Sequence, residues 1–299
     1  MNEPRHGSRV ELLLEALPYI QSFAGKTVVV KLGGNAMIDA DLEQAFALDI
    51  VLLRTVGLRP VVVHGGGPQI NRMLEELSIP SNFVRGLRVT DARTMRVVEM
   101  VLAGEINGEI VSRIQLAGGA AVGISGRDGG LLRARRKPPV GGEDLGQVGE
   151  VESVDAKVIE ALQDRGFIPV IAPVATGTDG ESLNVNADTA AGMIAAALGA
   201  ERLLLLTDVE GVLGADGTLV PTLTAAEARN LIASGVVDGG MIPKLECCLD
   251  ALAGGVGKVH MIDGRVPHSV LLELFTNAGI GTEVTAGEPE SSEAKTATR

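Results

Sequence analysis

The sequence predicts an α/β protein with an open, mainly parallel β-sheet sandwiched between helices and an extra amphipathic helix at the N-terminus. From residue 27 onward, short β-branched runs alternate with longer amphipathic runs, which is the βαβ pattern of a parallel sheet. At 299 residues and 45% hydrophobic content, the chain can bury a large core. Its 39 glycines and single tyrosine favour close packing of helices on the sheet.

The elements follow one another along the chain. We expect roughly seven or eight core strands, found in the runs 27–32, 60–64, 121–125, 167–174, 202–209, 258–262 and 281–284. Amphipathic or apolar runs predict helices at 42–56, 68–77, 92–116, 155–165, 187–198, 225–234, 243–252 and 268–277. The stretch 126–152, rich in glycine, proline and charge, is typical of hairpins on the rim of a sheet.

Three segments divide the chain. Residues 1–26 predict a short helix, because apolar side chains recur at helical spacing at Val10, Leu13, Leu14 and Leu17. Pro18 should kink or break that helix, which must pack on its own domain or on another subunit. Residues 27–286 form the main domain, with a loop near residue 180 between a first lobe (27–180) and a second lobe (181–286). The polar tail 287–299 is expected to be disordered.

Charge and composition exclude several partners. The formal net charge of −12 argues against binding to nucleic acid, which depends on clustered Lys and Arg. The longest apolar stretch, 187–206, is broken by charged residues, so no membrane span is expected, and the start of the chain does not resemble a signal peptide. Cys247 and Cys248 are adjacent, a poor geometry for a disulfide, which favours a reducing cytoplasm.

Two strands end in glycine-rich turns. Lys31 closes the run TVVVK and is followed by Gly33 and Gly34, and His64 closes PVVVH and is followed by three glycines. Glycines at the carboxyl end of a strand let backbone N–H groups turn toward a phosphate or carboxylate. For the first turn the alternative is a plain tight turn with a surface lysine. His64 suggests a catalytic role, although such a histidine is more often hydrogen-bonded in place.

The second half carries three polar motifs. LNVNADTAA places Asn184, Asn186 and Asp188 before a helix, where a polar turn with a helix cap is the alternative reading. LLLLTDVEGVL ends a buried strand in Thr207 and Asp208. In DGGMIPK, Lys244 lies on the first turn of a helix, where it opposes the helix dipole, as expected when function needs a cation. GxGxxG, Walker A and protein-kinase signatures are missing from the chain.

In this order, K-x-G-G, H-G-G-G, G-L-R-V-T-D, N-V-N-A-D, T-D-V-x-G-V and G-G-M-x-x-K resemble the amino acid kinase family over about residues 10–285. The resemblance implies an eight-stranded sheet with the acceptor bound over the first half and ATP, with Mg²⁺, over the second. The G-L-R-V-T-D and N-V-N-A-D segments point to the branch that phosphorylates the γ-carboxylate of N-acetyl-L-glutamate in arginine biosynthesis. Members acting on glutamate or carbamate are the alternatives, as is a non-catalytic sensor with the same fold.

The resemblance also assigns roles to residues. Lys31 and Lys244 would stabilise the transferring phosphoryl group, Gly34 and Gly67 would donate backbone N–H groups, and Asp188 would hold both lysines. The acceptor contacts would be Gly66, Gly67, Arg88 and Asn184, with Arg88 on the α-carboxylate. The adenine nucleotide site would comprise Asp208, Val209, Glu210, Gly211, Val212, Leu213, Val236, Val237 and Asp238.

The chemistry agrees with these roles. A side-chain carboxylate with a pKa of about 4.3 is ionised at neutral pH and needs no general base. Phosphoryl transfer depends mainly on positioning and on neutralising charge, which lysines, glycine N–H groups and Mg²⁺ supply. Because no dense carboxylate cluster is evident, we expect no metal ligands from the protein and Mg²⁺ held by the phosphates and water.

The two ends of the chain resemble the arginine-inhibited branch of the family. In that branch, kinked N-terminal helices interlace dimers into a hexamer, a trimer of dimers, and arginine binds between that helix and C-terminal elements. The resemblance assigns an arginine site to Tyr19, His268, Glu273 and Gly279. The alternative is that these residues only cap and pack the last helix.

Overall fold

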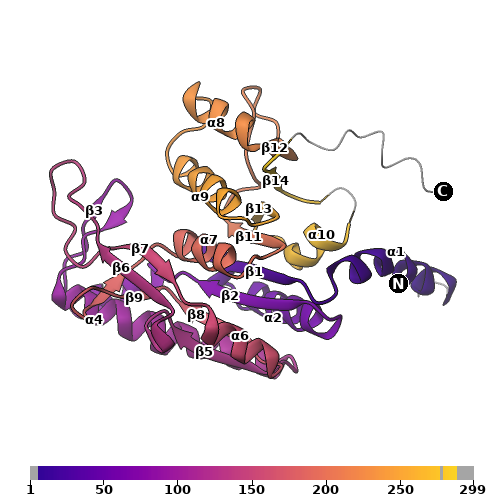
Figure 1. Cartoon of the computed structure of the whole chain (residues 1–299), viewed down its shortest axis with the longest axis horizontal. Coiled ribbons are helices and arrows are strands. Elements are labelled where there is room, and N and C mark those ends of the chain that lie inside the picture. Colours follow the sequence, from indigo (N-terminus) through magenta and orange to yellow (C-terminus); the bar gives the residue numbers. More distant parts are fainter. Residues whose placement is uncertain (1–5, 277–278, 288–299) are drawn as a thin grey trace.

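The computed structural model describes residues 6–276 and 279–287. Its centre is an eight-stranded sheet in the order β12-β14-β13-β11-β1-β2-β8-β5 (Figure 1). Neighbouring strands run parallel except for β13 and β14, which are antiparallel. The strands are β1 (Thr27–Leu32), β2 (Arg59–His64), β5 (Ala121–Ser125), β8 (Ile168–Ala172), β11 (Arg202–Thr207), β12 (Thr222–Thr224), β13 (Lys258–Asp263) and β14 (Thr282–Thr285). The expected open, mainly parallel α/β sheet is confirmed, and the strand missing from the predicted runs is the three-residue β12.

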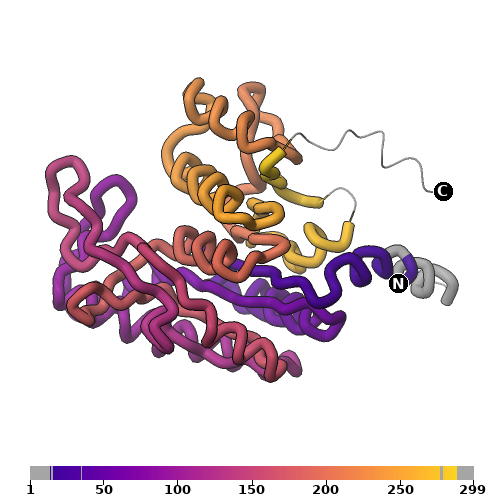
Figure 2. The backbone as a smooth tube through the Cα atoms, viewed as in Figure 1, coloured from indigo at the N-terminus to yellow at the C-terminus, as the bar shows by residue number. Residues whose placement is uncertain are grey.

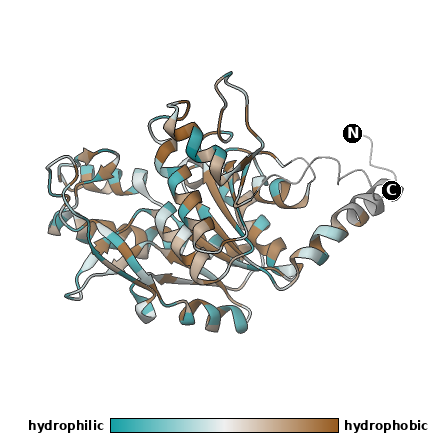
Figure 3. Cartoon of the chain, turned by 45° about the horizontal axis from the view of Figure 1, so that its top comes forward, coloured by the Kyte–Doolittle hydropathy of each residue, from teal (hydrophilic) through white to brown (hydrophobic). Residues whose placement is uncertain are grey.

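Helices cover both faces of this sheet. Alternate residues of β1 point to opposite sides, so Val28 and Val30 join one core while Val29 joins the other. Hydrophobic residues concentrate on the strands and on the inward sides of the helices (Figure 3). On the first side lie α2 (Ala40–Thr55), α3 (Gly67–Glu76), α4 (Ala92–Glu99), α5 (Asn107–Leu116) and α10 (Ser269–Phe275). On the second lie α6 (Lys157–Asp164), α7 (Ala187–Ala197), α8 (Ala225–Ala233) and α9 (Met241–Ala253).

The single helix predicted at 92–116 contains an internal π-helix. The segment η2 (Met100–Ile106) separates α4 from α5 without a break in the chain's helical path. Short 3-10 turns also occur at η1 (Gly34–Met37) and η3 (Asp128–Gly130). Hydrophobic periodicity cannot distinguish one wide turn inside a helix, so this feature was not expected.

A second, four-stranded sheet lies beside the first. Its order is β10-β9-β6-β7, with β6 (Leu132–Arg136), β7 (Gly149–Val154), β9 (Val174–Thr176) and β10 (Ser182–Asn184). The prediction of one strand at 167–174 was wrong. Pro173 has no N–H to donate to a neighbouring strand, and it separates β8 from β9, which belong to different sheets. The β6–β7 pair confirms the expected rim hairpin. β10 pairs with β9, so the sheets do not divide at residue 180, and the two-lobe division remains a proposal.

Two hairpins extend along the same side of the molecule (Figure 2). The smaller, β3 (Phe83–Val84) with β4 (Leu87–Arg88), turns through Arg85 and Gly86, both with positive φ. Its strands are two residues long, too short to show a period in the sequence. The larger carries basic residues on β6, and Arg135 pairs there with Glu150 at 2.8 Å.

The N-terminal helix α1 (His6–Phe23) projects from the body beside α10 (Figure 1). It continues as one element through Pro18, where a kink or break was expected. Phe23 is buried and meets Phe275 edge to face, with ring centroids 6.4 Å apart. Leu14 and Leu17 are exposed, whereas the side chains of Val10 and Leu13 lie outside the described residues. So does the tail 288–299. Among the described helices, none is long and apolar enough to cross a membrane.

Candidate active site

The two halves of the chain meet at the carboxyl ends of β1, β2 and β11. β1 lies between the other two strands, and Lys31 is in register with Val63 on one side and Leu205 on the other. Both glycine turns therefore open at the same edge of the sheet. Such an edge is where open α/β sheets bind ligands.

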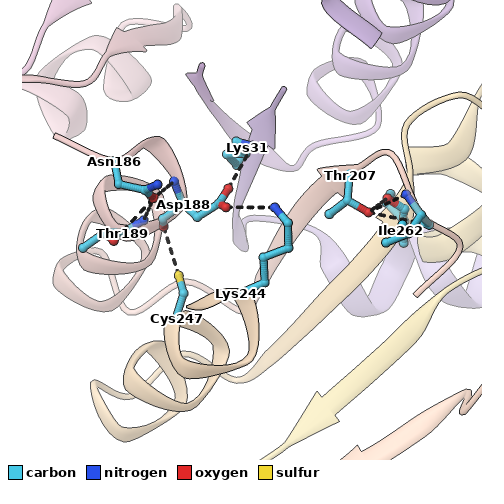
Figure 4. A network of polar contacts seen from close by, with 9 residues as sticks. Lys31, Asn186, Asp188, Thr189, Thr207, Lys244, Cys247 and Ile262 are labelled. Carbon is cyan, nitrogen blue, oxygen red and sulfur yellow. Dashed lines mark hydrogen bonds and ion pairs between the residues drawn. The ribbon is translucent and has the colours of Figure 1, made fainter. Parts of the chain in front are cut away.

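Lys31, Asp188 and Lys244 form an ion-pair cluster at this edge (Figure 4). Lys31 Nζ lies 2.9 Å from Asp188 Oδ1, and Lys244 Nζ donates to Asp188 Oδ2 at 3.0 Å. The residues come from β1, the first turn of α7 and the first turn of α9. The structure thus brings together two lysines that lie 213 residues apart (244 minus 31).

Asp188 is ionised in this cluster. Burial alone would raise its pKa, but the charges and hydrogen bonds of Lys31 and Lys244 hold the pKa at about 2. Asn186 is the cap of α7, because its Oδ1 accepts hydrogen bonds from the N–H groups of Asp188 and Thr189. The carboxylate of Asp188 therefore does not cap the helix and pairs with the two lysines instead. One anion between two cations leaves a net positive charge for an anionic ligand.

Each glycine of the K-x-G-G turn has its own steric cause. A Cβ at Gly33 would collide with the ammonium of Lys31, which folds over this residue. A Cβ at Gly34 would collide with the carboxylate of Asp208, and Gly34 also has a φ of +67°. The turn thus brings the end of β11 against the end of β1, and a Cβ at Gly33 would displace the Lys31 ammonium.

Arg88 is held in one orientation by four groups. Its Nη1 donates to Asn71 Oδ1 at 2.7 Å and to Ser81 Oγ at 2.5 Å, and its Nη2 donates to the Gly67 carbonyl at 3.2 Å. The ring of Phe83 lies 4.7 Å from the guanidinium carbon. A guanidinium has five N–H donors, so these three hydrogen bonds leave Nε–H and one Nη2–H for a further acceptor. A carboxylate is a suitable acceptor for them.

The predicted acceptor residues lie on one connected path. Arg88 contacts Gly67 directly, and its carbonyl accepts a hydrogen bond from Thr90 Oγ1 at 2.9 Å. Thr90 Oγ1 in turn accepts from Asn184 Nδ2 at 3.2 Å. Gly66 precedes Gly67 at the start of α3. The structure therefore joins the glycine turn, the β3–β4 hairpin and β10 through one chain of contacts.

The segments assigned to the nucleotide follow β11 and α8. Val212 and Val237 are buried in the core on the α7 and α9 side of the sheet, while Val209 and Leu213 are partly exposed. Thr207 Oγ1 donates to the Val209 carbonyl at 2.9 Å and fixes the first turn of the segment 208–213. The segment 236–238 ends at Asp238, whose carbonyl accepts from Met241 N–H at the start of α9. Lys244 lies one turn further along that helix.

The residues assigned to arginine lie around α10. Glu273 is buried, accepts from His260 Nδ1–H at 2.7 Å and also accepts the Ile280 N–H at 2.7 Å. Burial alone would raise the pKa of Glu273, but the hydrogen bond and charge of His260 lower it below its usual value. A Cβ at Gly279 would approach the Glu273 carboxylate. His268 is the N-cap residue of α10 and pairs with Asp49. Tyr19, on α1, packs against the core.

The site fits a metal carried by a nucleotide better than a resident metal. No group of three or more His, Cys, Asp or Glu side chains gathers as a metal site within residues 6–276 and 279–287. The Asp188 oxygens are engaged by lysines. That Mg²⁺ is held by ATP phosphates and water stays a prediction.

Comparisons with known proteins identify the family. The model of the amino acid kinase family matches residues 26–263. The chain belongs to the amino acid kinase family. It is 57% identical over 283 residues to the acetylglutamate kinase of Oleidesulfovibrio alaskensis, covering 92% of this chain and 96% of that protein. It is 58% identical over 280 residues to that of Nostoc sp., covering 93% of both. The expected resemblance to the acetylglutamate kinases of this family is confirmed.

A solved structure gives the same fold. The N-acetylglutamate synthase of Neisseria gonorrhoeae, complexed with coenzyme A and N-acetyl-glutamate, superposes with a TM-score of 0.84 at 30% identity over 94% of this chain. The chain spans 64% of that synthase chain. The shared part is the amino acid kinase fold described above.

Sequence reasoning missed the residues that orient Arg88. Asn71, Ser81 and Phe83 lie outside every motif of the sequence, and Thr90 appears only within G-L-R-V-T-D. One signal was present, because Asn71 lies four residues after Gly67 and hence on the same face of α3. In this amino acid kinase the surroundings of Arg88 thus include more residues than the motifs display.

Proposed function

We propose that this amino acid kinase transfers the γ-phosphoryl group of ATP to the γ-carboxylate of N-acetyl-L-glutamate and forms N-acetyl-L-glutamyl 5-phosphate. The observation that carries this proposal is the cluster of Lys31 and Lys244 on Asp188, beside two glycine turns. The identity to curated acetylglutamate kinases supports the choice of acceptor. The reaction belongs to arginine biosynthesis, and we place it in the cytoplasm.

The geometry suggests how the reaction proceeds. The acceptor carboxylate is already ionised, so the site must bring an anion onto the phosphates of ATP. Arg88 offers its two remaining N–H donors to the α-carboxylate, and Asn184 closes the same side. Lys31 and Lys244 offer N–H donors to the phosphoryl oxygens from both halves of the cleft, where preorganised donors stabilise the transition state. Mg²⁺ bound to ATP neutralises further charge.

A substrate panel tests the acceptor. ADP release is measured with N-acetyl-L-glutamate, glutamate, aspartate, carbamate and UMP, and hydroxylamine traps the acyl phosphate as a hydroxamate. We expect turnover and hydroxamate with N-acetyl-L-glutamate and at least a hundredfold lower kcat/KM with glutamate. Glutamate has no acetamido group, so the protein groups that bind the acetamido group would be left unpaired. Turnover only with another acceptor would disprove the proposal.

We further propose that arginine inhibits the enzyme and that it assembles as a hexamer through α1. Support comes from α1, which projects from the body with Leu14 and Leu17 exposed, and from the buried Glu273 near Gly279. Because both Glu273 oxygens already accept hydrogen bonds, arginine must share or replace them. We expect millimolar arginine to inhibit the full chain and deletion of residues 1–24 to abolish both the inhibition and the hexamer. Unchanged mass and inhibition after deletion would disprove this assignment.

A further inference from the structure

A buried polar network lies beneath the H-G-G-G turn. Asn107 is the first residue of α5, directly after the π-helix η2, and it is 4% exposed. Its Nδ2 donates to the Val170 carbonyl of β8 at 3.0 Å and lies 3.1 Å from His64 Nε2 of β2. On β5, a Cβ at Gly123 would collide with Asn107 Oδ1. One amide thus occupies a space shared by three neighbouring strands.

The hydrogen bonds define one tautomer of His64. Its Nδ1 lies 2.9 Å from the Gly65 carbonyl, which only accepts, so Nδ1 carries the hydrogen. Its Nε2 then accepts the hydrogen of Asn107 Nδ2, whose other hydrogen goes to Val170. Burial lowers the pKa of His64 to about 4, and the side chain is 0% exposed. His64 is therefore neutral and does not touch the ligand.

This network fixes the peptide between Gly65 and Gly66. In a trans peptide the carbonyl and the following N–H point in opposite directions. Because the buried imidazole of His64 holds the Gly65 carbonyl through Nδ1, the Gly66 N–H points away from His64. Gly66 is the residue before α3, so this N–H has no partner within the helix. The side chains of Leu102 and Ile106, on the π-helix, pack against Gly66, and a Cβ at Gly66 would collide with both of them.

We propose that His64 and Asn107 are positioning residues that aim the Gly66 N–H at the oxygens of the reacting groups. The inference rests on the proposed function, since the family resemblance assigns Gly66 to the contacts with the acceptor of that reaction. It explains why a neutral, fully buried histidine precedes the glycines. It also assigns a role to the π-helix. The π-helix and the residue after it place the side chains of Leu102, Ile106 and Asn107 beside the H-G-G-G turn. π-helical turns often occur at functional sites.

Two substitutions separate positioning from simple packing. In His64→Asn the amide nitrogen takes the place of Nδ1 and keeps the hydrogen bond to the Gly65 carbonyl, while the contact with Asn107 is lost. In His64→Gln the terminal amide takes the place of Nε2 and keeps the contact with Asn107, while the bond to Gly65 is lost. Glutamine also fills more of the space left by the imidazole. The two variants therefore divide the two hydrogen bonds of the parent.

We expect activity and stability to follow opposite orders. His64→Asn should keep kcat for N-acetyl-L-glutamate within about fivefold of the parent, while His64→Gln should lose about 10²-fold, the cost of a misplaced group. The KM for ATP should stay within about twofold in both, and the Tm of His64→Gln should equal or exceed that of His64→Asn. If kcat instead follows Tm across the two variants, the network only supports the fold and the proposal fails.

A structural measurement keeps the inference independent of the substrate. Crystal structures of both variants should show the Gly65–Gly66 peptide unchanged in His64→Asn and rotated in His64→Gln. An unrotated peptide in His64→Gln would overturn the positioning role even if the parent turns over N-acetyl-L-glutamate. A parent without that turnover would instead overturn the proposed function, and the peptide orientations would still decide the role of His64.

Discussion

The two glycine turns of the cleft are held in different ways. Over the K-x-G-G turn lie charged side chains, the ammonium of Lys31 on Gly33 and the carboxylate of Asp208 on Gly34. Under the H-G-G-G turn lie neutral and buried groups, His64 and Asn107 with two aliphatic side chains. The first turn is thus shaped by charged groups, and the second by neutral groups of the core. Charge changes should damage the chemistry of the first turn without unfolding the protein.

Removing either lysine should have the largest effect. We expect Lys31→Ala and Lys244→Ala each to lower kcat by about 10²- to 10³-fold, the usual cost of losing one preorganised donor to a developing charge. ADP release under saturating substrates measures this. Lys157→Ala is the matched control, because Lys157 also pairs with an aspartate but is exposed on α6. A kcat within threefold of the parent for both site variants would remove the lysines from the mechanism.

Asp188→Asn should lower stability in a pH-dependent way. The pKa of Asp188 is about 2 in the folded chain and about 3.9 when unfolded, so the carboxylate stabilises the fold above pH ~4. That contribution, about 2 kcal/mol, is lost as the pH falls from about 4 toward 2. Urea unfolding of parent and variant should therefore differ most at pH 7 and less at pH 3. A constant difference across this range would contradict the assigned ion pairs, and the exposed Asp155→Asn serves as the control.

Arg88→Lys tests the acceptor side. A single ammonium cannot bind Asn71, Ser81 and the Gly67 carbonyl and still offer two coplanar donors. We expect the KM for N-acetyl-L-glutamate to rise about 10- to 100-fold, equivalent to a lost charge-assisted hydrogen bond, with the KM for ATP unchanged. Steady-state kinetics with each substrate varied give both values. Arg93→Lys, exposed at the start of α4, should change neither.

Phe83→Ala should give the smallest effect. Phe83 is 52% exposed and contributes only the stacking of its ring on Arg88. Such a contact is worth about 0.5–1 kcal/mol at an exposed position, so the KM for the acceptor should rise about two- to fivefold. Phe167→Ala, a substitution of another partly exposed phenylalanine, is the control. A larger rise for Phe83→Ala than for Arg88→Lys would reverse the order expected from the contacts.

Much of the fold could be predicted because its signals are local. The five central strands β1, β2, β8, β11 and β13 form buried runs such as TVVVKL, and the helices beside them have clear apolar faces. Pro173 shows the limit, since the sequence marks the proline but not that the chain changes sheets there. The β3–β4 hairpin was missed because two-residue strands have no period, and its turn places Arg85, not only a glycine, at positive φ.

The site was predicted unevenly for a physical reason. Lys31, Asp188 and Lys244 lie beside glycines and helix starts, which the sequence displays. The pairing of both lysines with the Asp188 carboxylate depends on the order of strands in the sheet. Before the structure, only the resemblance to a family indicated this pairing. The contacts of Asn71 and Ser81 with Arg88 come from side chains without any local pattern, so only the folded structure shows them.

The π-helix makes the length of one segment as important as its composition. Each residue of a helix turns the chain by about 100°, so the loss of one residue between Glu99 and Asn107 would rotate α5 relative to α4. Asn107 would then face away from His64, although no buried side chain had been removed. Deleting the exposed Ala103 should therefore inactivate the enzyme, whereas replacing it with serine should not. In this stretch, an alignment gap is a stronger warning of lost function than a change of residue.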